Sequence, residues 1–334
     1  MPNHNRRDFL GMVSGAAATS PVGVSAARAA EPPPETTRVR IAKIAGICVA
    51  PQYVAEEFLR AEGFTDIEYV DAKVGPLLAT ALARGEYDFA MNYVALLISA
   101  VDAGEQVTML GGVHPGCYEL IAKQEITSVL DLKGKNVGVQ VLNSNPHLFL
   151  SAIANYVGLD PARDINWITD PKLKPRELFV RGDVDAFLSF PPETQDLRAA
   201  KIGHVILDSA VDRPWSQYFC CMLSANSGFV KANPAASKRV LRAILKAADL
   251  CVTDPEMVAQ RLVDGKFTAR YDYALQSLSE LPYVKWRDFN AEDSVRFYAL
   301  RLHEAGLIKT SPQQIIADGT DWRFIDELKR ELKM

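Results

Sequence analysis

The sequence predicts an α/β protein built from two lobes, each a β-sheet covered by helices, followed by a helical C-terminal segment. Three observations support this fold class. Segments with strand composition alternate with helical patterns of about a dozen residues, which predicts a parallel sheet wrapped by helices on both faces. The alternation begins again at residue 128, and beyond residue 230 only helical patterns follow. The chain of 334 residues is 48% hydrophobic and 23% charged, as expected for a globular protein.

The N-terminal segment has the pattern of a twin-arginine export signal. "NRRDFLG" sets a pair of arginines before an Ala-rich apolar run that closes on Ala-Arg-Ala at 27–29. The alternative is an N-terminal helix that happens to begin with two arginines. We expect residues 1–29 to be a signal peptide, residues 30–37 a linker, and the remaining chain to reside in the periplasm. A lipid anchor is not expected, because the first cysteine is Cys48, well beyond the apolar run.

The order of the elements follows from apolar periodicity and from Pro and Gly at helix ends. In the first lobe the expected strands are 38–46, 67–72, 87–93 and 107–113, and the expected helices are 51–63, 75–86 and 94–105. In the second lobe we expect strands within 128–141, 165–169, 184–190 and 204–208, and helices at 145–159 and 174–183. Helical patterns then occupy 234–252, 254–265, 271–281, 291–307 and 321–332.

Two motifs resemble those of a known family. "ALARGEYDFAMNYVA" (81–95) and "SVLDLKGKNVGV" (128–139) resemble the periplasmic substrate-binding proteins of ABC importers, in the nitrate, taurine, sulfonate and thiamine-pyrimidine class. The resemblance implies a type II periplasmic-binding-protein fold, with two Rossmann-like lobes joined by crossing strands near 120–126 and 218–224. It places lobe 1 at 38–122 and 222–334, lobe 2 at 123–221, and the helical C-terminal segment on lobe 1.

Ligands of open parallel sheets bind beyond the carboxyl ends of strands, in loops that lead into helices. In lobe 1 the loop "GICVAPQY" offers Gly46, where backbone can approach a ligand, together with Cys48 and Tyr53, whose ring could stack on it. Asn92 could reach the ligand or cap the following helix, and His114 could bond an anionic or heteroaromatic ligand or satisfy local backbone. A plain turn is the alternative for the loop at 46–53.

In lobe 2 the loop "QVLNSNPHL" offers side-chain donors just before a proline that suits the first turn of a helix. Glu193, after two prolines, could pair with an amine in the cleft or be a solvated glutamate at a helix start. The supply of aromatic side chains favours a ring-bearing organic ligand. The candidate ligand residues of this lobe and of the second crossing are Asn143, Ser144, Asn145, Phe190, Glu193 and Trp215.

The segment "DRPWSQYFCCML" contains two adjacent cysteines. If it is the strand that returns to lobe 1, alternation puts Cys220 and Cys221 on opposite faces, where each would pack as a small hydrophobe. A disulfide to another cysteine or reactive thiol chemistry are the alternatives. The five cysteines of the chain are scattered and odd in number, which does not resemble a disulfide framework.

No sequence pattern of an enzyme is present: the chain lacks HExxH, CxxC, GxSxG and GxGxxG. We expect a non-enzymatic solute-binding component of an ABC transporter, without cofactor or metal, that captures a small organic molecule or oxyanion. Its expected partners are this ligand and a permease in the inner membrane, and we expect a monomer. The alternatives are a ligand-sensing subunit for a membrane receptor and an enzyme similar to the pyrimidine-precursor synthases.

Charge excludes one class of partner. Loss of three arginines and one aspartate with the leader changes the formal net charge from −4 to −6. Proteins that bind nucleic acid carry basic patches, so a mildly acidic chain is not expected to bind it.

Overall fold

The computed structural model of the chain describes residues 31–44, 46–72, 75–170 and 172–332, and these contain two five-stranded sheets. The strand orders are β2-β1-β3-β10-β4 and β7-β6-β8-β5-β9. The predicted export signal at 1–29 lies outside the described residues. The strands are β1 (Arg38–Lys43), β2 (Asp66–Asp71), β3 (Phe89–Tyr93), β4 (Val107–Pro115), β5 (Glu119–Ala122), β6 (Asn136–Gly138), β7 (Asn166–Ile168), β8 (Ala186–Ser189), β9 (His204–Asp208) and β10 (Phe219–Asn226).

The first sheet is mixed, although the alternation of strands and helices by itself predicted a parallel one. β1 pairs parallel with β2 and β3, but β10 lies antiparallel between β3 and β4. β10 is the strand that returns from the other sheet, so it enters from the opposite end. Every residue of β3 is buried, as expected for a central strand with both faces covered.

The second sheet repeats this arrangement. β6 pairs parallel with β7 and β8, whereas β5 runs antiparallel to β8 and β9. β5 is the strand that arrives from the first sheet. Its pairing assigns Glu119–Ala122 to the second sheet, although the predicted lobe boundary placed these residues in lobe 1. Likewise, β10 joins the first sheet from Phe219, ahead of the predicted boundary at residue 222.

The helices cover both faces of the sheets. The predicted helix at 51–63 is divided into two short helices, α1 and α2, and α8 and α13 appear where no helix was expected. No helix of the described part of the chain has both the length and the apolarity needed to cross a membrane. The helices are η1 (Ile47–Val49), α1 (Ala50–Val54), α2 (Glu56–Ala61), α3 (Pro76–Ala83), α4 (Val94–Asp102), η2 (Val129–Leu132), α5 (Asn145–Tyr156), α6 (Pro175–Arg181), α7 (Glu193–Ala200), η3 (Trp215–Gln217), α8 (Ser227–Ala232), α9 (Pro234–Thr253), α10 (Pro255–Asp264), α11 (Tyr271–Glu280), η4 (Tyr283–Trp286), α12 (Ala291–Glu304), α13 (Pro312–Gly319) and α14 (Arg323–Glu331).

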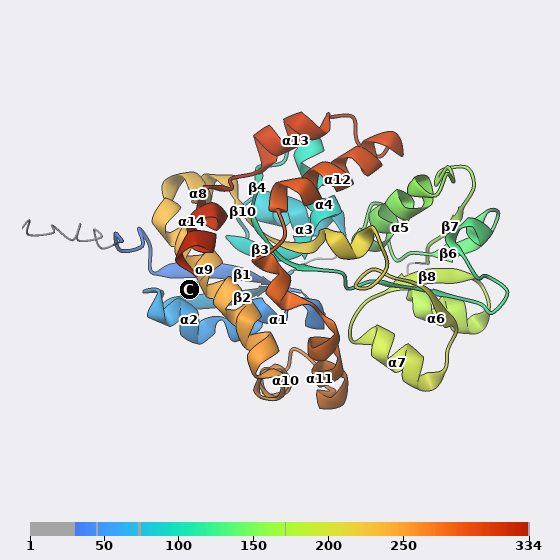
Figure 1. The fold of residues 1–334 in the computed structure, drawn as a ribbon, viewed down its shortest axis with the longest axis horizontal. Coiled ribbons are helices and arrows are strands. Elements are labelled where there is room, and N and C mark those ends of the chain that lie inside the picture. Colours follow the sequence, from blue (N-terminus) through green and yellow to red (C-terminus); the bar gives the residue numbers. More distant parts are fainter. Residues whose placement is uncertain (1–30, 45, 73–74, 171, 333–334) are drawn as a thin grey trace, which may run out of the picture. The chain divides into compact units, whose positions relative to one another are not determined.

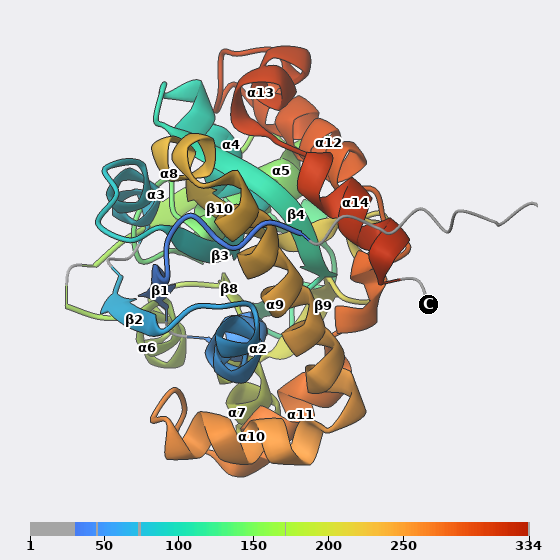
Figure 2. The same ribbon diagram turned by 90° about the vertical axis from the view of Figure 1, so that its left-hand side faces the viewer.

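The helical C-terminal segment packs on the first sheet, as the resemblance implied. α9 and α14 contact β4 and each other, and Figures 1 and 2 show both helices beside this sheet. The apolar face of α9 is buried, and Arg242 on the same helix donates to the buried carboxylate of Glu62 at 2.6 Å. Figure 1 shows α5, α6 and α7 around the second sheet.

The two segments that connect the sheets touch each other. The first passes through Gly116 and Cys117, and the second leaves β9 at Ser209. The Ser209 hydroxyl accepts hydrogen bonds from the backbone N–H groups of Cys117 and Tyr118, at 3.1 and 2.8 Å. Gly116 has φ +55, and a Cβ atom there would lie 2.2 Å from the Cα of Ala210. The crossings therefore form one tightly packed junction between the sheets.

Candidate functional site

Loops from the two sheets meet at the carboxyl ends of their strands. The N–H of Ile47 in the first loop donates to the carbonyl of Pro191 in the second-sheet loop at 3.2 Å. The ring of Phe190 lies over the same loop, because a Cβ atom at Gly46 would be 3.5 Å from it and 3.6 Å from the Cys48 sulfur. The structure thus brings three of the predicted residues together: Gly46, Cys48 and Phe190.

A second meeting point lies at the N-termini of α4 and α5, one helix from each sheet. The amide of Asn145, the first residue of α5, donates to Asn92 Oδ1 at 3.0 Å. Asn92 Oδ1 also accepts from the N–H of Tyr93, the residue before α4, at 2.7 Å. Asn92 does not cap α4, because the N-cap of this helix is Tyr93 and no side chain donates or accepts a capping hydrogen bond there. The Asn92 side chain instead contacts Asn145 of the second lobe, and its predicted contact with the ligand stays a prediction.

Several polar atoms at this meeting point are buried without a hydrogen-bond partner among the described residues. They are Asn92 Nδ2, Asn145 Oδ1 and the hydroxyl of Ser144, which precedes α5. Buried polar groups in folded proteins are nearly always hydrogen-bonded, so each unpartnered atom needs an explanation such as a missing ligand or water. A Cβ atom added at Gly75, in the facing loop, would lie 3.8 Å from the Cβ of Ser144. The two loops therefore approach each other closely.

Two other predicted residues lie elsewhere. Asn143 is exposed, and its N–H donates to His147 Nδ1 at 3.2 Å. The Tyr53 hydroxyl bonds both backbone groups of Ile44, and its ring stacks on Phe267 with centroids 4.0 Å apart, so it is committed to packing within the first lobe. Its predicted role of stacking on a ligand does not fit this position.

Trp215 also packs inside the protein rather than lining an open cleft mouth. It is 3% exposed, and its ring lies edge-on to Phe149 and Tyr156 of α5 and to Phe297 of α12, with centroids 5.4 to 5.6 Å apart. Aromatic rings prefer such edge-on contacts. Trp215 therefore connects a helix of the second lobe to the C-terminal segment.

Glu193 begins α7 and pairs within its own lobe. Its Oε2 accepts a hydrogen bond from the Ser189 hydroxyl at 2.9 Å. Burial raises the pKa of Glu193 above its usual value, while the Ser189 bond and the charges of Arg176 and Lys174 lower it. An exposed glutamate at a helix start, one of the two interpretations of the sequence, is not what the structure shows.

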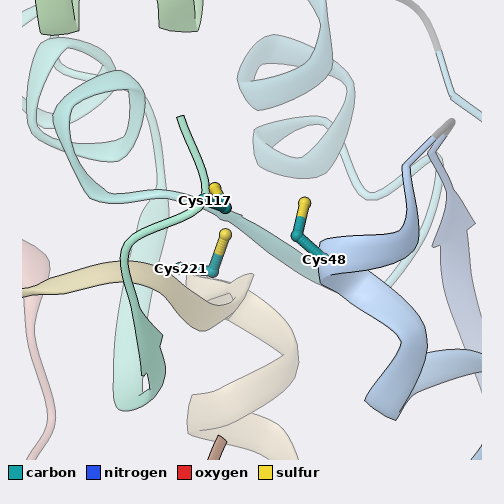
Figure 3. Close-up of side chains that lie close together, drawn as sticks. All are labelled: Cys48, Cys117 and Cys221. Carbon is teal, nitrogen blue, oxygen red and sulfur yellow. The ribbon is translucent and has the colours of Figure 1, made fainter. Parts of the chain in front are cut away.

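Four of the five cysteines of the chain gather at the junction of the crossings. The sulfur atoms of Cys48 on η1, Cys117 on the first crossing and Cys221 on β10 lie within 4.8 Å of one another, and Figure 3 shows them side by side. Cys220 Sγ is 2.9 Å from Cys117 Sγ and 4.0 Å from Cys221 Sγ. All are buried free thiols.

The prediction that Cys220 and Cys221 occupy opposite faces is therefore wrong. The pairing of β10 with β4 shifts register between Phe219 and Cys221 and again between Cys221 and Met222. Such irregularities locally break the alternation of side chains along a strand. Both sulfurs consequently reach the same cluster instead of packing separately as small hydrophobes.

His114 lies next to this cluster. It is the cross-strand partner of Cys221, it is fully buried, and its Nε2 has no hydrogen-bond partner among the described residues. Burial lowers the pKa of His114, but the charge of the neighbouring Cys221 and the backbone of Pro115 and Gly116 outweigh it and raise this pKa above its usual value. Hydrogen bonds from Cys117, Cys220 and Cys48 lower the pKa of Cys221 well below its usual value.

The profile of the NMT1-like family matches residues 32–262, more than half of the chain. The chain belongs to the NMT1-like family. This assignment confirms the resemblance seen in the sequence motifs. A search of curated proteins finds no match to the chain.

Solved structures confirm the predicted fold of this NMT1-like protein. The nitrate-binding protein NrtA of Synechocystis PCC 6803 superimposes with a TM-score of 0.76 at 17% identity, over 90% of each chain. The alkanesulfonate-binding protein SsuA of Xanthomonas axonopodis pv. citri, bound to MOPS, gives 0.68 at 18% identity, over 86% of this chain and 99% of that one. The aliphatic sulphonate binding protein SsuA of Escherichia coli gives 0.65 at 21% identity, over 84% and 91%.

Two hollows on the surface of the NMT1-like protein lie away from these loops. One, of about 520 Å³, is lined by α4, α13 and the residues around Asp321, and the other, of about 370 Å³, lies between the ends of α5 and α12. None of the eleven predicted ligand residues lines either hollow. The candidate site is thus defined by contacts between loops of both sheets.

Sequence reasoning missed Cys117, Cys221 and Glu119. Glu119, on β5, is 6% exposed, and its Oε1 lies 3.3 Å from an Arg198 nitrogen, while its Oε2 has no partner among the described residues. Burial raises the pKa of Glu119 to about 7, with Asp208 and Glu280 adding to the rise and Arg198 opposing it. No local sequence signal marks such a group, because its partners come from three other elements.

This pKa predicts a pH dependence of stability. A carboxyl group with a raised folded pKa binds more protons in the folded than in the unfolded state between about pH 4.5 and 7, so the free energy of unfolding falls as pH rises through that window. Between these pH values, we expect the free energy of unfolding of Glu119→Gln to fall by about 1 to 3 kcal/mol less than that of the unmodified protein. Urea unfolding at pH 5 and pH 8 measures it. Glu125→Gln, at an exposed carboxylate, should keep the profile of the unmodified protein, and a Glu119→Gln profile as steep as the original would contradict the assignment.

Proposed function

We propose that this NMT1-like protein is the periplasmic solute-binding component of an ABC importer, which closes its two lobes on a small anionic solute. The main support is the hydrogen bond between Asn92 and Asn145 at the N-termini of α4 and α5. Buried polar atoms beside it have no hydrogen-bond partner among the described residues. The family and the fold support the same role.

The chemistry of this meeting point favours an anion. Free N–H groups and the helix dipole make the N-terminus of a helix attractive to negative charge. Here two such termini, one from each sheet, approach each other, and α4 contacts α5. Asn92 Nδ2 and the Ser144 hydroxyl supply further donors. Nitrate and sulfonates, which the similar structures are named for binding, have the oxygen acceptors that such donors require.

The solute stabilises the closed arrangement by contacting both lobes, since a ligand shifts a conformational equilibrium only through its different affinity for the two states. Export by a twin-arginine signal at 1–29 and delivery to an inner-membrane permease by a monomer belong to this proposal. The ligand-sensing subunit is the second candidate for the same site, and a partner that binds only the loaded form would distinguish a receptor from a permease.

The first experiment is a thermal-shift screen of the protein against nitrate, MOPS and other sulfonates, pyrimidines and aromatic acids. A ligand at a hundredfold excess over its Kd adds about 2.7 kcal/mol to the free energy of unfolding. We expect at least one oxyanion or sulfonate to raise Tm and to reduce the radius of gyration in small-angle scattering. Stabilisation by none of them, in a folded sample, would contradict an anionic solute.

The site predicts the effect of its asparagines on this ligand. We expect Asn92→Ala and Asn145→Ala each to weaken binding by about 10- to 100-fold, because a hydrogen bond to a charged ligand in a buried site contributes about 1.5 to 3 kcal/mol. Isothermal titration calorimetry measures the Kd. Asn166→Ala, on β7 in an exposed position, is the matched control and should bind normally. Equal affinity in all three variants would remove Asn92 and Asn145 from the site.

A further inference from the structure

Packing alone does not require the cysteine sulfurs at the junction to lie so close together. Cys48, Cys117 and Cys221 are far apart in the sequence, yet their sulfurs lie within 4.8 Å of one another in a buried position. Figure 3 shows the three side chains arriving from η1, the first crossing and β10. We propose that Cys48, Cys117 and Cys221 form a binding site for one soft, thiophilic metal ion, of the kind represented by Cu(I). This site stands on its own geometry and does not depend on the proposed solute.

The donor set selects the class of metal. Thiolate sulfur is a soft ligand that favours Cu(I), zinc and iron–sulfur clusters over hard cations such as Mg²⁺ or Ca²⁺. Structural zinc is almost always held by four ligands in a tetrahedron. The group of mutually close donor atoms contains three sulfurs and neither His114 nor Cys220. Three sulfurs around one point suit Cu(I), which accepts trigonal coordination.

The three sulfurs are held in place by the backbone that carries them. The N–H of Cys117 donates to Ser209 Oγ at 3.1 Å, and the carbonyl of Cys48 accepts from the Tyr283 hydroxyl at 3.3 Å. Cys221 sits in β10, between β3 and β4. A metal site on fixed elements loses little conformational freedom on binding, so its affinity is high.

The surroundings also suit a thiolate-bound ion. Binding releases the thiol protons to solvent and leaves negative charge on sulfur. His114 lies beside Cys221 as its cross-strand partner. Phe190 covers the Cys48 loop, as the contacts at Gly46 show, and it belongs to the second lobe. The ion therefore reaches the sulfurs when the lobes separate and is shielded from water when they meet.

The test is an anaerobic titration of the reduced full-length protein with Cu(I), in competition with the coloured Cu(I) complex of bicinchoninate. We expect the protein to withdraw one Cu(I) per chain, with an ultraviolet thiolate-to-copper charge-transfer band. X-ray absorption at the copper edge of the unmodified protein should show three sulfur neighbours. This readout does not depend on the folding of any variant.

Variants locate the site. Each of Cys48→Ala, Cys117→Ala and Cys221→Ala should weaken Cu(I) binding by more than about a hundredfold, since loss of a mere supporting partner of a metal ligand already costs about 10- to 100-fold. Cys251→Ala, at a buried cysteine on α9 outside the cluster, is the matched control and should keep one Cu(I) per chain. Circular dichroism verifies that each variant is folded.

Several results would overturn the proposal. The chelator could keep all the Cu(I), the copper spectrum could show nitrogen and oxygen neighbours alone, or Cys251→Ala could lower binding as much as Cys221→Ala. Binding of Zn(II) but not Cu(I), abolished by His114→Gln, would also overturn it in favour of a tetrahedral zinc site. The titration measures copper binding and the screen measures solute binding. Failure of the metal-site proposal therefore leaves the proposed function intact, and the reverse also holds.

Discussion

Gly116→Ala should lower the free energy of unfolding by about 4 kcal/mol or more, a loss that only a few kinds of substitution produce. Gly116 has φ +55, where an alanine costs about 1 to 2 kcal/mol by itself. The larger part of the loss comes from the clash of the new Cβ with the backbone of the second crossing. The new Cβ would lie 2.2 Å from Ala210 Cα, 2.5 Å from its nitrogen and 2.6 Å from the Ser209 carbonyl oxygen.

Backbone atoms cannot rotate away as a side chain can, so the two crossings would have to separate. Their separation would also break the hydrogen bonds that Ser209 Oγ accepts from Cys117 and Tyr118. Urea unfolding followed by circular dichroism measures the loss. Two-state proteins have a total stability of about 5 to 15 kcal/mol, so this variant should be close to unfolding at moderate temperature.

The matched control is Gly306→Ala. Gly306 has φ +71, but no atom lies within 4 Å of the position its Cβ would take. We expect this variant to lose only about 1 to 2 kcal/mol, the conformational part of the effect. If both alanine variants lost the same free energy of unfolding, the close approach of the crossings would not contribute to stability. That result would contradict the tight packing of the junction.

Trp215→Ala should be the second most damaging change, with a loss of about 3 to 5 kcal/mol in the free energy of unfolding. The residue is 3% exposed and packs edge-on against Phe149, Tyr156 and Phe297. Its removal leaves a cavity between α5 and α12 that rigid aromatic neighbours cannot fill. Denaturant unfolding measures the loss, and calorimetry with the solute identified in the screen measures binding.

Trp215→Phe is the matched variant, because it keeps an aromatic ring in the same space. We expect it to retain most of the stability, with a loss of about 1 to 2 kcal/mol, and to leave the solute Kd unchanged. The sequence alone suggested a ligand contact for Trp215. A Trp215→Phe variant with full stability and a strongly weakened solute affinity would support that interpretation and contradict the packing role.

Element type was predictable where local pattern decides it. β3 and α9 lie within one or two residues of their expected bounds, because a buried apolar run and an amphipathic helix leave a periodic signal. The helix expected at 51–63 is broken at Ala55 between α1 and α2, which tertiary packing imposes on a continuous pattern. The antiparallel direction of β5 and β10 could not be predicted from their residues, because it depends on the sheet from which the preceding segment comes.

Residues of the candidate site were predictable only as members of loops. The rule that ligand loops follow strand ends singled out the loops of Asn92, Asn145, Phe190 and Gly46, and the structure brings loops of the two sheets into contact there. It could not determine which side chains in those loops turn inward. Asn143 is exposed while its neighbour Ser144 is buried, and Tyr53 points into the first lobe.

The sequence by itself determined the two α/β lobes, the helical C-terminal segment and the family resemblance, because periodicity and short motifs are local properties of the chain. Only the tertiary structure decided that Cys48, Cys117 and Cys221 share one site. Their spacing matches no metal motif, and the register shift in β10 that unites Cys221 with Cys220 arises from pairing with β4. Long-range strand pairing determines that convergence, and no local pattern records it.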